Sequence, residues 1–132
     1  MFKVAAVLSG IALLAGCASS SDMRYAPIDA GISKTYNAPY EQVKRLSLES
    51  VQGLNVDVKS TRDSGKVFYI EFSKPMSAFS WGEVGRVTVV DKEPISQVIV
   101  LSEKRYKVQV TGTEVDEFAQ AIFDGIERAL DQ

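Results

Sequence analysis

The sequence predicts an α+β fold in which a five- to six-stranded antiparallel sheet carries two helices on one face. Three observations predict it: two segments have an apolar stripe at helical spacing, several segments between them alternate apolar and polar residues, and short turn sequences join those segments. Short links between consecutive strands imply an antiparallel meander, and striped helices need a surface to bury against. The expected order of elements is β-α-β-β-β-β-β-α.

The folded part of the chain is expected to begin with a strand and a helix. Residues 32–37 (ISKTYN) alternate weakly, which predicts a strand. Asn37 or Ala38 is expected to cap the following helix, because Pro39 fits a first helical turn. The helix is expected to run to about Gln52, with an apolar face that contains Tyr40, Val43, Leu46 and Val51.

A hairpin is predicted after this helix. Gly53 is expected to end the helix in a left-handed conformation. Residues 54–58 and 67–72 alternate in period two and predict two strands, and the turn sequence at 62–65 (RDSG) is expected to join them. In the second strand, the side chains expected to face the helices are Phe68, Ile70 and Phe72.

Three more strands are predicted in the second half of the chain. They are expected near residues 83–90, 95–101 and 106–110. The turn sequences at 91–94 and 102–105 are expected to join them. These short connections favour an antiparallel arrangement of the three strands.

The final helix has the strongest pattern in the sequence. Thr113, with Asp116 three residues later, resembles a capping box in which Asp replaces Glu. The start of this helix also contains acidic residues, which the positive end of the helix dipole stabilises. One broad apolar stripe predicts a helix packed against the sheet, and it comprises Val115, Phe118, Ala119, Ile122, Phe123, Ile126 and Leu130.

The first residues of the chain have the pattern of an export signal. A cation at Lys3 precedes an apolar run over residues 4–14, and small residues follow. The run is shorter than the roughly 20 residues that a helix needs to cross a hydrocarbon core. Residues 1–16 are therefore predicted to be a signal peptide and not part of the fold.

The end of this peptide, Leu14-Ala15-Gly16-Cys17, resembles the lipobox of bacterial lipoproteins. The resemblance implies that Cys17 carries lipid on its sulfur, that the preceding peptide is removed, and that the new amino terminus is acylated. In Gram-negative lipoproteins an Asp after this Cys favours the inner membrane, so Ala18 favours the outer membrane, with the domain facing the periplasm. The alternative is that Cys17 is a small apolar residue of an ordinary signal peptide.

The remaining chain divides into a tether and one domain. Residues 17–31 combine the acylated Cys with a stretch that is rich in small and polar residues and has no periodic apolar face, which predicts a flexible tether. Its fourteen residues after Cys17, fully extended, span about 46 to 50 Å. Residues 32–132 are predicted to form a single α+β domain in the periplasm.

The predicted domain resembles the small helix-grip or BamC-like domains of bacterial envelope lipoproteins. The order of its elements carries this resemblance. A second feature is the run Tyr-x-Ala-Pro-x-Glu-x-Val at residues 36–43, which short envelope lipoproteins of unknown function share. The resemblance implies a fold and a location, and it assigns no functional residues to this chain.

The composition excludes most familiar catalytic and metal sites. The chain has no His and one Cys, so it has no Ser-His-Asp or Cys-His relay, no imidazole ligand and no internal disulfide. Asp91 and Glu93 in one turn sequence are more typical of solvated acids than of a glycosidase pair. We therefore expect no enzyme activity, no cofactor and no metal.

The charge balance also bears on partners. After removal of residues 1–16 the chain keeps 14 basic against 17 acidic residues, a net charge of −3. A nucleic-acid partner is not expected, because the basic residues are scattered among acidic ones. The same balance argues against a polybasic membrane anchor, so the lipid is expected to provide the attachment.

The segment 73–82 is the most unusual part of the mature chain and contains its only Trp. Hairpin links usually have two to five residues, so a longer one needs a reason. One interpretation is that its large side chains cover an end of the core. The other is a contact loop for a partner or the bilayer interface, with Met76, Phe79 and Trp81 as contact residues.

The outer face of the sheet is a second candidate surface. The alternation places Val67, Tyr69 and Glu71 there, and in the strand at 106–110 it also places Arg105, Lys107, Gln109 and Thr111 there. A solvated face is the simpler interpretation, because half-polar outer faces are normal in antiparallel sheets. Docking of a protein partner or a peptidoglycan fragment is the alternative.

These observations together predict a small membrane-anchored lipoprotein that acts as a non-catalytic binding or envelope-assembly module. Its expected partners are the membrane, through the lipid anchor, and an envelope protein. The alternative is a small-ligand binder or weak hydrolase that uses a cleft between helix and sheet. The oligomeric state is left open, because the sequence does not indicate which strand lies at the sheet edge.

Overall fold

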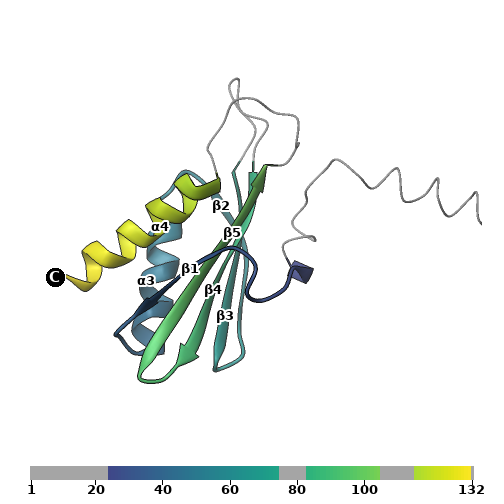
Figure 1. The fold of residues 1–132 in the computed structure, drawn as a ribbon. Helices are drawn as coiled ribbons and strands as arrows, with labels where there is room; N and C mark the ends of the chain where they lie inside the picture. The colour runs from purple at the N-terminus through teal and green to yellow at the C-terminus, as the bar shows by residue number, and fades with distance from the viewer. Residues whose placement is uncertain (1–23, 75–82, 105–114, 132) are drawn as a thin grey trace, which may run out of the picture.

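The computed structural model describes residues 24–74, 83–104 and 115–131 (Figure 1). Seven elements follow one another in these ranges, with two helices and five strands. In chain order they are β1 (Ile32–Tyr36), α3 (Tyr40–Gln52), β2 (Asp57–Asp63), β3 (Val67–Lys74), β4 (Glu83–Lys92), β5 (Ile95–Lys104) and α4 (Val115–Leu130).

The five strands form one antiparallel sheet in the order β1-β5-β4-β3-β2. Both helices lie on the same face of this sheet (Figure 1). Strands β2 to β5 form a meander, and β1 adds to the free edge of β5. The predicted α+β class, the antiparallel sheet and the two helices are therefore confirmed. The strand expected at 106–110 and the cap expected at Thr113 lie outside the described residues.

One hydrophobic core fills the space between the sheet and the helices. Strand β3 contributes Phe68, Ile70 and Phe72, the side chains that the alternation predicted to face the helices. The rings of Phe72 and Phe118, on β3 and α4, have their centroids 5.7 Å apart. The other members from the helices include Val43, Leu46, Val51, Ile122, Phe123 and Ile126. The periodic stripes of the sequence are thus the faces that the two helices bury.

The two helices also contact each other. The Ser50 hydroxyl of α3 donates a hydrogen bond of 2.8 Å to the Ile122 carbonyl of α4. This bond satisfies a polar group at the junction of the helices, where an unpaired hydroxyl would be costly. No helix in the described ranges is both long and apolar enough to cross a membrane.

The ends of α3 differ from the prediction. Pro39 is the residue that precedes the first helical turn, so the cap is neither Asn37 nor Ala38, and no side chain caps the helix. Gly53 at the other end has φ −75°, a right-handed value, so the left-handed stop was wrong. The chain leaves the helix instead through a tight turn, in which the Leu54 amide donates to the Val51 carbonyl at 3.0 Å.

The strand boundaries differ where tertiary pairing decides them. Strand β2 covers Asp57–Asp63 and not 54–58, because Leu54 and Val56 pack against the core before the strand starts. The turn that follows is accordingly shorter than the predicted 62–65 segment. Strand β5 includes residues 102–104, where a turn was expected at 102–105, because its residues up to Lys104 pair with the start of β4.

We expect Gly85→Ala to destabilise the domain. Gly85 of β4 lies opposite Phe72, and an added methyl group would overlap the Phe72 ring, which is buried in the core. Overpacking of this kind costs about 1–3 kcal/mol. The decrease in the free energy of unfolding is measurable by thermal or urea denaturation.

Gly53→Ala is the matched control for this substitution. Gly53 has a right-handed backbone, and an added methyl group meets only ordinary contact distances of 3.5 Å. It should leave the stability unchanged or slightly raise it. Equal stability of the two variants would contradict the packing assigned to Gly85.

Candidate functional site

The residues that the sequence singled out for function lie outside the described ranges. They are the lipidation residue Cys17 and the contact residues Met76, Phe79 and Trp81. The outward residues predicted for the strand at 106–110 lie outside as well. These assignments stay predictions, and the structure reveals a different feature on the face where Glu71 was expected.

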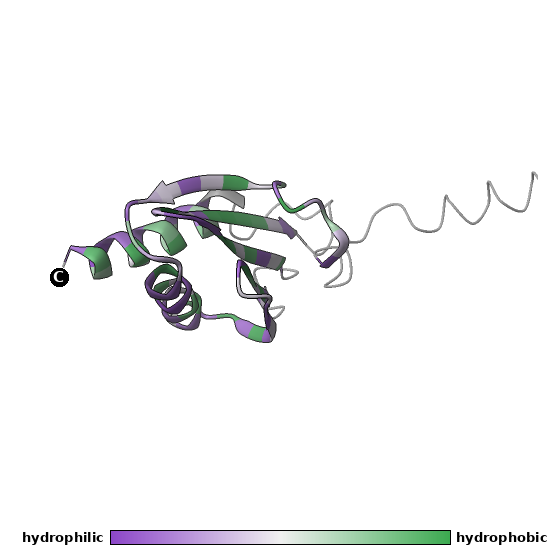
Figure 2. Cartoon of the chain, turned by 90° about the horizontal axis from the view of Figure 1, so that it is seen from below, coloured by the Kyte–Doolittle hydropathy of each residue, from purple (hydrophilic) through white to green (hydrophobic). Residues whose placement is uncertain are grey.

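A segment that precedes the first strand lies on the outer side of the sheet. Residues 24–31 pass on the side opposite to the helices, as both views of the chain show (Figures 1 and 2). We call this stretch the N-terminal strap. It turns through an Ala30 amide that donates to the Pro27 carbonyl at 3.1 Å. Gly31 then leads into β1 with φ +117°, packed so closely on the Val100 carbonyl that no side chain fits.

The first attachment of the strap is an ion pair with Glu71 on β3. The Arg24 guanidinium donates two parallel bonds of 3.1 Å to the two carboxylate oxygens of Glu71. The Ser60 hydroxyl adds a third bond of 2.9 Å, and Arg62 Nη2 lies 3.8 Å away. Only 3% of the Glu71 side chain is exposed, so these donors replace the water that it lost.

These donors also decide the charge of the buried carboxyl. Burial by itself raises the pKa of Glu71, but the hydrogen bonds from Arg24 and Ser60 and the positive charges of Arg24 and Arg62 outweigh burial. The net result is a pKa below the ordinary value of a Glu. Glu71 is therefore ionised at neutral pH, and its pairing with Arg24 is an interaction between full charges.

The second attachment uses the buried Arg86 of β4. Its two terminal nitrogens donate to consecutive backbone carbonyls of the strap, those of Ala26 at 2.9 Å and Pro27 at 2.7 Å. Arg86 is 1% exposed, and burial lowers its pKa, but a guanidinium stays charged in proteins. The rigid fork of Arg suits two neighbouring acceptors, which a Lys ammonium would not match. Together, Glu71 and Arg86 hold both the side chain of residue 24 and the backbone that follows it.

This arrangement corrects two expectations. The tether was predicted to reach Gly31, but its last eight residues, 24–31, carry specific contacts to the sheet. The outer face was predicted to be solvated, but Glu71, Arg86 and Thr88 near its centre are buried. The alternation of β3 correctly placed Glu71 on that face. It contained no signal for the partner, because Arg24 lies 47 residues away in the chain.

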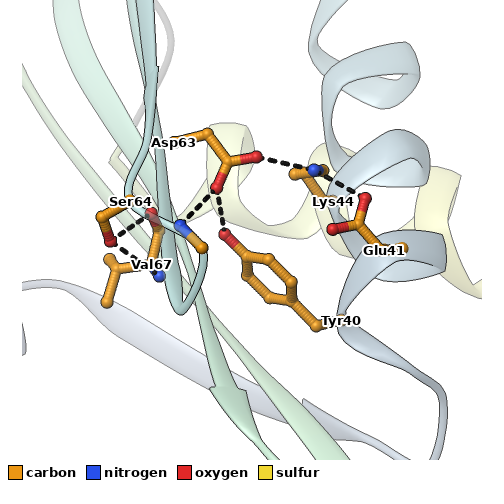
Figure 3. Close-up of polar contacts among 7 residues, drawn as sticks. Tyr40, Glu41, Lys44, Asp63, Ser64 and Val67 are labelled. Atoms are coloured by element: carbon orange, nitrogen blue, oxygen red, sulfur yellow. Dashed lines mark hydrogen bonds and ion pairs between the residues drawn. The ribbon is translucent and has the colours of Figure 1, made fainter.

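A second polar network joins the first turn of α3 to the turn between β2 and β3 (Figure 3). Asp63 is its centre and accepts hydrogen bonds from the Tyr40 hydroxyl at 2.8 Å, the Lys44 ammonium at 2.6 Å and the Gly65 amide at 2.9 Å. Lys44 also pairs with Glu41 at 2.6 Å. The network fixes the helix relative to the hairpin.

The protonation states in this network are set by the same contacts. The hydrogen bond from Lys44, followed by those from the Gly65 amide and Tyr40, lowers the pKa of Asp63 to about 2. Burial and the neighbouring Asp63 carboxylate raise the pKa of the Tyr40 phenol. Tyr40 therefore stays protonated at neutral pH, and its hydroxyl donates a hydrogen bond to the ionised Asp63 carboxylate.

A hollow of about 470 Å³ opens beside this network, at the start of α3 and the hairpin turns. It includes Asp91 and Glu93, the pair considered as catalytic acids. The Asp91 carboxylate accepts a hydrogen bond of 3.0 Å from the Glu93 amide, an arrangement typical of a turn. The described residues contain no cluster of three or more His, Cys, Asp or Glu side chains that could hold a metal ion.

The space between helices and sheet bears on the alternative of a ligand cleft. Among the described residues, Phe72, Ile122, Phe123 and Ile126 fill this space and are at most 2% exposed. A smaller hollow of about 200 Å³ lies at its rim, beside Leu54 and Phe118. The described part of the interlayer space is therefore a packed core.

Comparisons with known proteins identify no family for this chain. No family model matches the chain, and no curated protein matches it. Among solved structures, the crystal structure of Ara h 8.0201 is similar over 76% of this chain and 96% of that chain, with a TM-score of 0.48 and 12% sequence identity. A likeness at this level carries no argument about function.

We expect Glu71→Gln to loosen the strap without unfolding the domain. The substitution removes the negative charge that pairs with Arg24, while an oxygen acceptor remains for Ser60. Because trypsin cleaves after Arg and needs a locally open chain, cleavage after Arg24 should become several-fold faster. The measurement is the rate of this cleavage under native conditions, with mass spectrometry to identify the site.

Glu49→Gln is the control for the loss of one negative charge. Glu49 pairs with Arg45 on the exposed face of α3, and this helix lies on the other side of the sheet from the strap (Figure 1). Its cleavage rate after Arg24 should equal that of the parent protein. In the parent protein, acid should also loosen the strap. Because the pKa of folded Glu71 is lowered, the ion pair stabilises the strap fully above the ordinary Glu pKa of about 4.3, and this stabilisation is lost as the pH falls through the lower pKa of folded Glu71. Since trypsin is inactive in acid, this loss is measured by amide hydrogen exchange of residues 24–31. An unchanged rate in Glu71→Gln would show that the ion pair does not hold the strap.

Proposed function

We propose that the chain is a small lipoprotein of the outer membrane, anchored by acyl chains on Cys17, whose α+β domain acts in the periplasm as a non-catalytic binding or envelope-assembly module. The observation that carries the proposal is the sequence Leu14-Ala15-Gly16-Cys17 directly after an apolar run. It accounts for the position of the only Cys in the chain. Two or more acyl chains are sufficient for stable anchoring.

The attachment of the strap supports a module that is held at a membrane. If Cys17 is acylated, six residues, 18–23, connect the anchor to the first strap contact at Arg24. The strap in turn is attached to the sheet by its hydrogen bonds with Glu71 and Arg86. A restricted position above the membrane suits a module that must meet partners in the envelope.

The charged clusters of the described residues have the features of structural contacts and not of a general acid. Glu71 and Asp63 each accept at least three hydrogen bonds or ion-pair contacts from neighbouring side chains or amides. Both have lowered pKa values, which suits permanent ion pairs and does not suit a general acid. We assign both clusters to holding elements together.

The second candidate, a small-ligand binder or weak hydrolase, has less support. It requires a cleft between helix and sheet, and the described side chains in that space form the packed core. The partner contact is therefore proposed to be the loop with Met76, Phe79 and Trp81. The competing interpretation of these side chains as a cover of the core remains an outcome of the experiment below.

We expect Cys17→Ser to abolish lipid labelling and to release the protein from membranes. The substitution removes the sulfur that carries the lipid and leaves no other Cys in the chain. The measurement combines incorporation of a labelled fatty acid with fractionation of the cells. Ser19→Ala, which alters the tether and not the lipobox, should keep both properties. Retention of Cys17→Ser in the membrane fraction would refute the lipid anchor.

Photo-crosslinking in intact cells tests the binding role. A photoreactive residue at position 81 should form a discrete adduct with an envelope protein, because Trp and Met are enriched at the energetic centres of interfaces. The mass of the adduct identifies the partner. A photoreactive residue in place of Gln52, exposed at the end of α3, is the control. Crosslinks confined to this chain would instead show that Trp81 covers the core.

A further inference from the structure

Glu71 and Arg86 hold a chain segment of defined chemistry on the outer face of the sheet. We call these two side chains the strap cradle. The Glu71 carboxylate matches a guanidinium, because it accepts two parallel hydrogen bonds from Arg24. The Arg86 fork matches two consecutive carbonyls, those of Ala26 and Pro27. The cradle residues are only 3% and 1% exposed, so the docked segment contacts two charges that are shielded from water.

The strap is a segment that can separate from the domain without unfolding it. None of its eight residues, 24–31, is buried, and none belongs to the hydrophobic core. The strap is also not one of the five strands of the sheet, and it joins β1 through Gly31. Its release therefore leaves the core contacts and the strand pairs in place. Such a local opening requires less free energy than global unfolding.

We propose that two copies of the chain exchange straps, so that the strap of each copy docks on the cradle of the other. The site is then shared, because Arg24 comes from one copy and the cradle comes from the second copy. Exchange breaks and forms the same contacts, so the two arrangements differ mainly in the connection between strap and β1. The inference rests on the proposed lipid anchor at Cys17, which confines the copies to one membrane surface.

The lengths of chain on both sides of the strap favour a second copy as the occupant of the cradle. Seven residue steps separate Cys17 from Arg24 and span at most about 23 to 25 Å, so anchored copies hold their straps and cradles close to the same membrane surface. Five steps separate Pro27 from Ile32 and span at most about 16 to 18 Å, which reaches a domain that lies alongside. This confinement raises the effective concentration of a segment that already matches the cradle.

Reciprocal exchange gives the pair a closed arrangement. Each copy contributes the same strap and the same cradle, as in the isologous interface of a two-fold dimer. Because each copy has one strap and one cradle, both are filled in the pair, and the association does not continue to a third copy. The outer faces of the two sheets lie toward each other, and the helices α3 and α4, on the opposite side of each sheet, stay outside the contact (Figures 1 and 2).

The experiment divides the shared site between two variants of the acylated full-length protein, mixed in phosphatidylcholine vesicles. Glu71→Gln keeps the strap arginine and lacks the cradle charge, whereas Arg24→Gln keeps the cradle charge and lacks the strap arginine. Trypsin cleavage after residue 24 therefore reports on Glu71→Gln alone. The matched control replaces Arg24→Gln in the mixture by the double variant Arg24→Gln and Glu71→Gln, which lacks both charges.

Cleavage after Arg24 should be several-fold slower in the mixture with Arg24→Gln than in the mixture with the double variant. Equal rates in vesicle-bound protein would overturn the inference and leave the lipid anchor intact. Equal protection by both partners would overturn it as well, because the contact would then not use the Glu71 charge. Sedimentation with the vesicles reports on the anchor separately. Protein that does not sediment would refute the anchor and the inference together.

A second measurement keeps both charges in every copy. Arg24→Lys is prepared with light and with heavy nitrogen, the two forms are mixed on vesicles, and a carbodiimide joins the amine at position 24 to the Glu71 carboxylate as an amide. Mass spectrometry should find light–heavy pairs in this amide. The ion pair of Lys34 and Glu127, 3.2 Å apart within one domain, is the internal control and should give same-isotope pairs. Same-isotope pairs at both sites would overturn the exchange.

Discussion

The burial of two charged side chains on neighbouring strands constrains the outer half of this structure. Glu71 of β3 and Arg86 of β4 lie opposite each other in the sheet, and both are almost completely buried. Buried charges are costly unless they are paired and hydrogen-bonded, and removal of a partner leaves that cost uncompensated. Arg24 and the carbonyls of Ala26 and Pro27 supply those partners. The path of the N-terminal strap therefore follows from the charges beneath it.

The same principle gives the sheet two different faces. On the inner face the burial is apolar, and the two helices cover side chains such as Phe72 with their stripes. On the outer face the strap covers a polar centre through the Arg24 side chain and the carbonyls of Ala26 and Pro27. The network around Asp63 closes one end of the molecule by joining the first turn of α3 to the β2–β3 hairpin. The fold is thus held by a core on one side and by specific charged contacts on the other.

The strap connects the architecture to the proposed function. In a lipoprotein, a domain on a long free tether samples many positions above the membrane. A strap that is bonded to Glu71 and Arg86 shortens the free connection and gives the domain one side toward the anchor. With the lipid anchor that we propose at Cys17, the strap contacts to the two buried charges would position the domain relative to the membrane.

The sequence by itself determined the features that depend on local pattern. The stripes of α3 and α4, the inward side chains Phe68, Ile70 and Phe72, and the resulting α+β class follow from periodicity, because burial of one face acts on every turn or every second residue. The lipobox interpretation also rests on local pattern, as do the contact residues of the 73–82 loop. Tertiary structure decided the rest: the start of β2, the extension of β5 and the right-handed end of α3 at Gly53. It also decided the strap, since the bond from Arg24 to Glu71 joins residues far apart in the chain, and no local spacing encodes a contact that forms only when the sheet brings its partners together.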